Sequence, residues 1–444
     1  MTFTPEAIDL LIEARWIAQV EPDRVLENHA LAAQGGRIAA ILPIGEARRR
    51  FRPDKRVALD RHILIPGLVN LHTHAAMSLM RGLADDLPLM DWLQKHIWPA
   101  EAAHLSAQFA LDGTRLACAE MLRGGITCFN DMYFFPEAAA TAASEFGMRA
   151  AIGLTALEFP NPYGSDADDY LNKGLTVREQ WRGQPLISFC LAPHAPYTVA
   201  DATFERIRVL SDQLGLPVHC HVHETRREVA DAIARDGQTP LARLHRLGLL
   251  GPGFIGVHGI HLSDEDIDLL AATGSHIAHC PASNLKLACG IAPVARLHRR
   301  GVNVGLGSDG AASNNRLDLF GEMRLAALLS GNAGDGEGAL TAREALRMAT
   351  LNGAGALGLG RETGSLTPGK AADLCAVDLG GLESRPCFDP VSHLVFVAGR
   401  EAVTHVWIAG KCCVDDKKML ESPTNTLDAA IALWQNRLEV HRYI

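Results

Sequence analysis

The sequence predicts an α/β fold in which a (β/α)8 TIM-like barrel carries a small β-sandwich domain built from both ends of the chain. Short apolar runs alternate with helix-length segments through the middle of the chain, and β-like runs separated by turns fill both ends. The 444 residues, 48% of them apolar, are enough for a barrel of about 250 residues plus a smaller unit.

Eight apolar runs are the candidate barrel strands. Their alternation with helix-length segments is typical of parallel strands joined by crossover helices, and eight of them favour a closed barrel over an open doubly wound sheet. The runs cover residues 63–71, 127–130, 150–154, 186–191, 217–220, 254–257, 276–279 and 302–306. The predicted barrel domain spans residues 65–362.

Both ends of the chain show a second pattern, in which short β-like runs lie between Gly, Asp and Pro turns. Such runs cover residues 30–33 and 37–42 before the barrel, and 372–377, 393–397 and 404–409 after it. We therefore expect residues 1–64 and 363–444 to build one sandwich. Residues 426–438 have the apolar spacing of an amphipathic helix, so the second part should end in a helix.

Charge, hydropathy and cysteine usage narrow the class of protein. The net charge of -9 is spread along the chain without a cluster of Lys and Arg, so nucleic acid is not an expected partner. No apolar run reaches the roughly 18 residues that cross a bilayer, and the start lacks a signal-peptide pattern. The ten cysteines contain no CxxC pair. We expect a cytoplasmic protein without a membrane partner; the sequence leaves the oligomeric state open, a homo-oligomer included.

A set of His and Asp residues follows the predicted strands, at the end where a barrel places its chemistry. His72 and His74 alternate along the end of the first strand and therefore point to one side, while His221, His258 and Asp309 follow later strands. Imidazole nitrogens and a carboxylate suit Zn²⁺, with Fe²⁺ as the other option. The fourth strand ends without a Lys that could support a second metal, so one Zn²⁺ per chain is expected.

The choice among neighbouring histidines stays open on the residues alone. His219, His221 and His223 alternate, so all three could face inward, and two of them should be structural. His258 and His261 both follow the same predicted strand, and the pattern does not separate them.

Two carboxylates have both a catalytic and an ordinary interpretation. Asp309 lies in the string GLGSDG, which could be a turn with an Asx cap, but after the eighth strand of a closed barrel it becomes a metal ligand. Glu224, three residues beyond His221, lies close to the metal without being needed as a ligand, which suits a proton carrier. The alternative for Glu224 is a carboxylate stabilised by the dipole of a helix N-terminus.

Several unusual strings occur together in one order. They are PGLVNLHTHA (66–75), LMRGLADDL (79–87), APHAPY (192–197), HVHET (221–225), PASNLKL (281–287) and LGSDGAASNN (306–315). With them the chain resembles, over nearly its whole length, the amidohydrolase superfamily, and within it the 5-methylthioadenosine/S-adenosylhomocysteine deaminases.

The resemblance implies a role for each site residue. The implied metal ligands are His72, His74, His221 and Asp309, the implied proton-handling residues are Glu224 and His258, and the implied nucleoside contacts are His194 and, for the ribose hydroxyls, Glu101. Without the resemblance, Glu101 would be interpreted as a solvated helix residue.

The reaction that the resemblance implies is hydrolytic deamination of a 6-aminopurine nucleoside: 5′-methylthioadenosine, adenosine or S-adenosylhomocysteine. Glu224 would relay a proton to the ring nitrogen, His258 would polarise the attacking oxygen, and Asp309 would accept a proton that leaves with ammonia. Where family members use an arginine for the S-adenosylhomocysteine carboxylate, this chain has Leu154, which could pack against a thiomethyl group. S-adenosylhomocysteine is therefore expected to be the less favoured substrate.

Other functions fit the same scaffold. The deaminated ring could be guanine, a pterin, cytosine or an s-triazine. A binding protein that has lost its chemistry is a more distant alternative, because all the expected ligand positions are occupied. The missing lysine after the fourth strand disfavours an amide-opening hydrolase.

Overall fold

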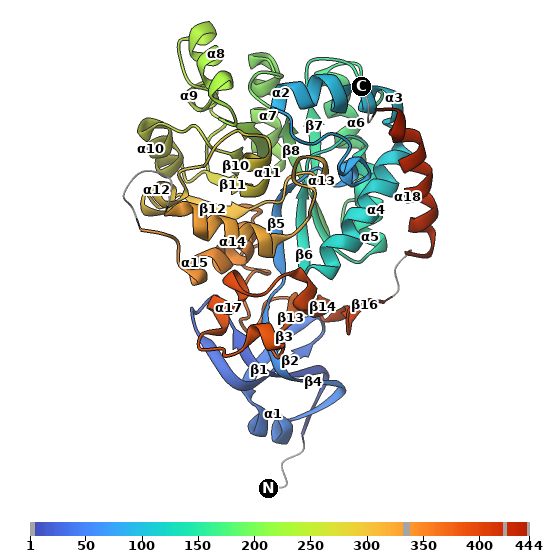
Figure 1. The fold of residues 1–444 in the computed structure, drawn as a ribbon, viewed down its shortest axis with the longest axis vertical. Coiled ribbons are helices and arrows are strands. Elements are labelled where there is room, and N and C mark those ends of the chain that lie inside the picture. The colour runs from blue at the N-terminus through green and yellow to red at the C-terminus, as the bar shows by residue number, and fades with distance from the viewer. Residues whose placement is uncertain (1–4, 332–337, 421–423, 442–444) are drawn as a thin grey trace.

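Two eight-stranded sheets organise the computed structural model, which describes residues 5–331, 338–420 and 424–441. One sheet is parallel throughout and alternates with helices, and the other joins strands from both ends of the chain. In Figure 1 the parallel sheet and its helices form the broad upper part of the molecule, and the second sheet forms the tapering lower end.

The parallel sheet is the predicted barrel, which is confirmed. Each strand pairs with the next one along the chain, and the strands are β5 (Leu68–Thr73), β6 (Ile126–Asp131), β7 (Arg149–Ala156), β8 (Ile187–Pro193), β9 (Val218–Val222), β10 (Phe254–His258), β11 (His276–His279) and β12 (Asn303–Leu306). Between the first and last strands, the backbone N–H of Asp309 donates to the carbonyl of His72 at 3.0 Å. The side chain of Asn70 also donates to Ser308 Oγ at 2.7 Å, so the barrel is nearly closed.

The close approach of β12 to β5 explains why Gly307, the second glycine of the string GLGSDG, is a glycine. A Cβ added at Gly307 would lie 2.9 Å from His72 Cβ and 2.9 Å from the His72 backbone nitrogen, closer than real Cβ atoms come. A side chain here would push the two strands apart. Closure of the barrel therefore requires this glycine, and it brings Asp309 beside His72.

Helices cover the outside and the mouth of the barrel. The long connection from β5 to β6 contains the 3-10 helix η1 (Ala75–Met80), α2 (Leu89–Trp92), the π-helix η2 (Leu93–Ile97), α3 (Trp98–His104) and α4 (Ala107–Arg123). The later helices are α5 (Pro136–Glu145), α6 (Ala167–Gln180), α7 (Asp201–Leu214), α8 (Arg226–Asp236), α9 (Pro240–Arg246), α10 (Asp264–Thr273), α11 (Pro281–Lys286), α12 (Val294–Arg299), α13 (Ala311–Asn314), α14 (Leu319–Ser330), α15 (Ala342–Arg347), η3 (Met348–Asn352) and α16 (Gly353–Ala356). None of the helices in the described part of the chain is long and apolar enough to cross a membrane.

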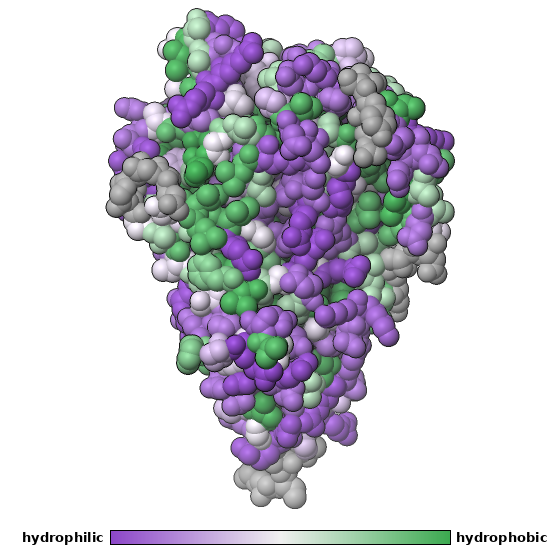
Figure 2. Space-filling view, in the orientation of Figure 1, coloured by the Kyte–Doolittle hydropathy of each residue, from purple (hydrophilic) through white to green (hydrophobic). Residues whose placement is uncertain are grey.

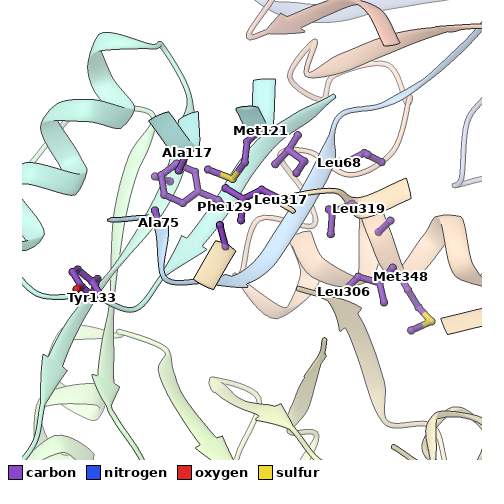
Figure 3. Packing of buried hydrophobic residues seen from close by; sticks show 14 of the residues in the cluster. Leu68, Ala75, Ala117, Met121, Phe129, Tyr133, Leu306, Leu317, Leu319 and Met348 are labelled. Carbon is purple, nitrogen blue, oxygen red and sulfur yellow. The ribbon is translucent and has the colours of Figure 1, made fainter. Parts of the chain in front are cut away.

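Apolar side chains between strands and helices make the main core. Phe129 of β6 lies with Ala117 and Met121 of α4, and all three are fully buried (Figure 3). Burial of this kind stabilises the fold by roughly 25 cal/mol for each Å² of apolar surface removed from water. The packing fixes β6, and with it the loop that follows β6 at the barrel mouth.

The second sheet confirms that both chain ends build one β-rich unit. Its strands, in spatial order, are β16 (Lys418–Met419), β15 (Lys411–Asp415), β14 (Val403–Ile408), β13 (Leu374–Asp378), β4 (Phe51–Pro66), β1 (Glu6–Ala18), β2 (Val25–Gln34) and β3 (Arg37–Pro43). One apolar cluster contains side chains from strands of both chain ends, among them those of Ile12, Leu64, Leu374 and Trp407. Helix α1 (Ile44–Arg50) covers a second cluster, and the visible face of this end is largely hydrophilic (Figure 2).

One predicted strand is wrong. Residues 393–397 were expected to be extended, but most of them lie in α17 (Pro390–Phe396). The Asp389 carboxylate accepts the backbone N–H of Val391 at 2.9 Å, and Pro390 takes the first helical position. Because this start signal is strong, it outweighs the β-branched residues that follow. The short 3-10 helices η4 (Leu382–Ser384) and η5 (Arg400–Ala402) lie on either side of α17.

The predicted C-terminal helix is confirmed as α18 (Thr424–Leu438), followed by η6 (Glu439–His441). It lies beside α4 and close to α3 (Figure 1). The indole N–H of Trp434 donates to the Asp112 carboxylate of α4 at 3.0 Å, and the Trp434 ring meets Phe109 edge-on with centroids 5.1 Å apart. The end of the chain therefore supports the helices that lead to the barrel mouth.

Candidate active site

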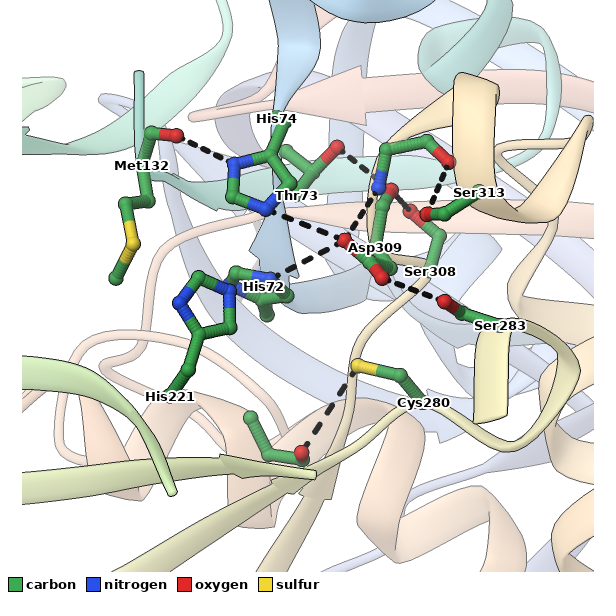
Figure 4. A network of polar contacts seen from close by, with 12 residues as sticks. His72, Thr73, His74, Met132, His221, Cys280, Ser283, Ser308, Asp309 and Ser313 are labelled. Carbon is green, nitrogen blue, oxygen red and sulfur yellow. Dashed lines mark hydrogen bonds and ion pairs between the residues drawn. The ribbon is translucent and has the colours of Figure 1, made fainter. Parts of the chain in front are cut away.

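Three histidines and an aspartate meet at the carboxyl end of the barrel. The Nε2 atoms of His72 and His74 each lie 3.3 Å from Asp309 Oδ1. The His221 ring centroid lies 4.9 Å from that of His72 and 5.4 Å from that of His74. Figure 4 shows His72 and His74 directed at Asp309, with His221 beside them. The structure thus brings together all four residues that the sequence predicted as metal ligands.

Backbone carbonyls fix two of the rings. The Nδ1–H of His74 donates to the carbonyl of Met132 at 2.5 Å, and the Nδ1–H of His221 donates to the carbonyl of His194 at 2.7 Å. A carbonyl can only accept a hydrogen bond, so in a neutral ring the proton sits on Nδ1. The Nε2 lone pair of each ring is then free for a metal.

His72 has a buried nitrogen without a hydrogen-bond partner. Its Nδ1 lies 3.0 Å from His219 Nε2, whereas its Nε2 has none, although the side chain is fully buried. Burial lowers the pKa of His72 to about 4, so the ring is neutral near pH 7. Buried polar atoms are normally paired, and a neutral nitrogen facing Asp309 fits a metal ion.

The structure assigns different positions to the three alternating histidines, His219, His221 and His223. His221 lines the cavity, whereas His219 contacts the far side of the His72 ring. The ring of His223 turns away: its Nδ1–H donates to the carbonyl of His261 at 2.9 Å, and its Nε2 accepts the backbone N–H of Leu241 at 3.2 Å. Two of the three are therefore structural or supporting residues, as the sequence predicted.

Asp309 is held in place through both carboxylate oxygens. Oδ2 accepts the hydroxyl of Ser283 at 2.6 Å, and Oδ1 accepts the backbone N–H of Gly310 at 2.7 Å. Burial opposes ionisation, but the neighbouring rings of His72, His74 and His258 hold the pKa of the carboxyl well below its usual range. Asp309 is therefore a carboxylate at neutral pH, as a metal ligand must be.

Glu224 and His258 form a second pair beside this cluster. His258 Nε2 lies 3.6 Å from Glu224 Oε1, and the Nδ1–H of His258 donates to Asn284 Oδ1 at 2.8 Å. Burial raises the pKa of Glu224. Burial alone would lower the pKa of His258, but the carboxylates of Glu224 and Asp309 raise it. A buried acid and base that lie close together and have shifted pKa values are typical of sites of proton transfer.

The possible metal donors form two overlapping groups that share His72. One contains His72, His74 and Asp309, and the other contains His72, His221 and His258; within each group the donor atoms lie within 4.8 Å of one another. The cluster therefore supports a divalent metal.

A cavity of about 340 Å³ opens above these residues. We define the inner end of the cavity as the part lined by His74, His221, Glu224, His258 and Asp309. Its outer end is lined mainly by apolar residues of α2 to α3 and of the loops after β6 and β7, namely Leu89, Trp92, Leu93, Ile97, Trp98, Phe134, Leu157, Phe159, Pro160 and Pro162. Neither Lys nor Arg occurs among the described residues that line it.

Glu101 and His194, which the family resemblance implies as nucleoside contacts, both line this cavity. Glu101 Oε1 accepts the hydroxyl of Tyr133 at 2.7 Å, and burial raises the pKa of its carboxyl to about 7. The Nδ1 of His194 lies 3.0 Å from Thr198 Oγ1, and burial lowers the pKa of His194 to about 3. A titratable carboxyl group and a neutral imidazole thus line the cavity together with the apolar side chains of its outer end.

The structure corrects the prediction for Leu154. This side chain lies outside the cavity, fully buried between β7 and α6, where a Cβ at Gly174 would come within 3.1 Å of Leu154 Cβ. Odd and even positions of a strand face opposite sides of the barrel, and Leu154 faces the helices. It cannot touch the tail of a substrate in this cavity.

Two further site residues were missed by the sequence interpretation. Tyr133, two residues beyond the end of β6, binds Glu101, and Asn284 of α11 binds His258. The same strand-end rule that identified the histidines could have indicated Tyr133. Asn284 lies within the string PASNLKL, which supports the family resemblance but does not by itself indicate a contact with His258.

Known proteins share this fold and length. The model of the amidohydrolase family matches residues 63–413. A 5-methylthioadenosine/S-adenosylhomocysteine deaminase of Saccharophagus degradans is 47% identical over 435 residues, 98% of each chain. A 5′-deoxyadenosine deaminase of Methanosarcina mazei is 40% identical over 415 residues, which is 93% of this chain and 94% of its own. The crystal structure of an adenosine deaminase from Xanthomonas campestris with bound zinc is 50% identical, with a TM-score of 0.97 over 98% of this chain and 100% of the other.

Proposed function

This chain belongs to the amidohydrolase family, and we propose that it is a zinc-dependent deaminase of 6-aminopurine nucleosides that releases ammonia and the inosine-type product. The observation that carries the proposal is the Glu224 and His258 pair, 3.6 Å apart, beside the His and Asp cluster at the inner end of the cavity. Relatives that align over nearly the whole chain act on adenosine-type nucleosides, as their names state.

One Zn²⁺ per chain would be held by His72, His74, His221 and Asp309, with Fe²⁺ as the other metal that suits these donors. The unpaired Nε2 of buried His72 supports this assignment. When bound, the metal would lower the pKa of a water molecule to about 7. We place His258 outside the ligand set, because its Nε2 faces Glu224.

Three side chains carry out the proton transfers and polarise the attacking oxygen. Glu224 takes a proton from the attacking water and delivers it to the purine ring nitrogen, for which its raised pKa is suited. His258 donates a hydrogen bond to the oxygen that adds at C6, while Asn284 holds its other ring nitrogen. Asp309 accepts the proton that then leaves with ammonia.

The outer end of the cavity selects the nucleoside. Glu101 accepts hydrogen bonds from the ribose hydroxyls, and His194 contacts the substrate. The 5′ group meets an apolar wall that includes Phe134, Leu157 and Phe159. A methylthio group fits such a wall, whereas the carboxylate of S-adenosylhomocysteine would lose its hydration without a Lys or Arg among the described lining residues.

The test is ammonia release from a panel of adenosine, 5′-methylthioadenosine, S-adenosylhomocysteine, guanine and cytosine at one pH and ionic strength. We expect 5′-methylthioadenosine or adenosine to have the highest kcat/KM, followed by S-adenosylhomocysteine, with the free bases far behind. Preferential turnover of guanine or cytosine would contradict a nucleoside deaminase. A clear preference for S-adenosylhomocysteine would contradict the assigned apolar 5′ pocket.

A further inference from the structure

The start of α8 departs from an ordinary capping box. Thr225 is the N-cap, and its Oγ1 accepts the backbone N–H of Glu228 at 3.0 Å. In a capping box, the carboxylate three residues later returns to the backbone N–H of the N-cap residue itself. Helix α15 shows this complete arrangement, because Glu344 accepts the N–H of Thr341 at 2.7 Å.

The Glu228 carboxylate reaches further back. Its Oε1 accepts the backbone N–H of His223 at 3.1 Å, and its Oε2 accepts the backbone N–H of Glu224 at 2.7 Å. Both carboxylate oxygens thus accept hydrogen bonds from the turn that precedes the helix. Burial raises the pKa of the Glu228 carboxyl, while the two backbone N–H groups that donate to it oppose that rise. Hydrogen bonds to a carboxylate are stronger than bonds between neutral groups, particularly where water has little access.

The turn that these bonds hold has an uncommon backbone conformation. His223 has φ of +54°, in the left-handed region that residues other than glycine seldom adopt. Because of this twist, the His223 ring packs away from the cavity against His261 and Leu241, while the next side chain, Glu224, lines the cavity. A relaxed turn would reorient both side chains.

We propose that Glu228 is a positioning residue, which clamps the backbone of His223 and Glu224 so that the Glu224 carboxylate faces the substrate. The inference rests on the proposed function, since it acts through the role given to Glu224. Glu228 lies outside the assigned metal ligands and substrate contacts, so its loss should slow the chemical step and leave the metal in place.

The first test replaces Glu228 by Gln, which has the same size but only one acceptor oxygen and leaves one of the two amides unpaired. We expect kcat to fall about 10- to 100-fold, the scale for residues that orient a site from behind. KM for adenosine and the zinc content per chain should stay near their native values. If this variant does not fold, Glu228→Asp serves instead, since its carboxylate is one methylene too short to reach both amides.

The matched control is Glu344→Gln, which disturbs the same helix position in the ordinary capping box of α15. It should lower Tm but leave kcat unchanged. A loss of kcat in both variants in proportion to their Tm would overturn the proposal, because general destabilisation would then explain it.

A double-mutant cycle with Glu224→Gln separates this inference from the proposed function. If Glu228 acts through Glu224, the double variant should be no slower than Glu224→Gln alone. Multiplied losses, or a native kcat in Glu228→Gln while Glu224→Gln is slow, would overturn the positioning role and leave the function standing. Native turnover in Glu224→Gln itself would instead overturn the proposed function.

Discussion

The inner and outer ends of the cavity are held by different kinds of structure. At the inner end, the side chains leave the ends of hydrogen-bonded barrel strands, and His74 and His221 are each fixed by a backbone carbonyl. At the outer end, the wall consists of the short helices from α2 to α3 and of loops that follow the strands. A hydrogen bond between Tyr133, in the loop after β6, and Glu101 of α3 connects the loops to the helices.

This difference assigns different consequences to substitutions. The inner end depends on the barrel itself, so a lost donor there should remove the metal and the turnover of every substrate together. The outer end depends on contacts between separate segments, so changes there should alter the choice among nucleosides while the metal stays bound. One scaffold can in this way keep its chemistry while its substrate range changes.

The largest effect is expected at the inner end, for His72→Ala. Loss of the buried nitrogen leaves an incomplete donor set, so the zinc content should fall from one per chain to near zero and turnover of all nucleosides should be lost. Elemental analysis of the purified variant checks this. His276→Ala is the control, because that ring lies at the start of β11 and bonds the Pro252 carbonyl. Full occupancy in His72→Ala would rule out its role as a ligand.

The next effect tests the outer end through Glu101→Ala. Removing a charged acceptor should cost about 1.5 to 3 kcal/mol of transition-state binding, or roughly a 10- to 150-fold loss in kcat/KM for adenosine. The zinc content should not change. 2′,3′-Dideoxyadenosine, which lacks both hydroxyls, should lose far less. Equal losses on both substrates would contradict a contact between Glu101 and the ribose.

His219→Ala probes the support behind the inner end. His219 Nε2 lies 3.0 Å from His72 Nδ1, and such supporting bonds typically contribute 10- to 100-fold in metal affinity. We expect zinc to bind that much more weakly in competition with a chelator, while turnover at saturating zinc stays close to native. His261→Gln, whose ring nitrogen contacts the Cys289 carbonyl, is the comparison. Unchanged zinc affinity would show that His219 only fills space.

The inner end could be predicted from the sequence because the signal is local. Barrel strands are encoded in the alternation of apolar runs, and residues that follow a strand must reach the mouth. The period alone could not choose among His219, His221 and His223, since all three share one face of an ideal strand. The strand ends at Val222, and the left-handed backbone of His223 turns its ring away. That change depends on tertiary contacts.

The outer end could not be predicted in the same way. Glu101 has the sequence context of a solvated helix residue, and its pKa is raised because α3 folds over the barrel mouth near Tyr133. The family resemblance implies that Leu154 lies in the cavity, but the register of β7 turns it outward. Contacts between segments far apart in the chain leave no periodic trace in the sequence.

The smallest effect is expected for Tyr133→Phe, which removes the hydroxyl that binds Glu101 and keeps the ring. Loss of one hydrogen bond should cost about 0.5 to 1.5 kcal/mol, or roughly 2- to 12-fold in kcat/KM for adenosine at pH 7. Burial raises the pKa of Glu101 to about 7, and the Tyr133 hydroxyl opposes that rise. The carboxylate that accepts both ribose hydroxyls is therefore present above about pH 7 and is lost as the pH falls through that value.

In Tyr133→Phe the pKa of Glu101 should rise further, so the fall in kcat/KM for adenosine should begin at a higher pH than in the native protein. A pH profile of both proteins from acid to mildly alkaline conditions measures this shift. 2′,3′-Dideoxyadenosine is the control, since its binding does not use the Glu101 carboxylate and its profile should stay in place. If the pH profile of kcat/KM shifted equally for both substrates, the titrating group would lie at the inner end. The two ends of the cavity would then not have separate roles.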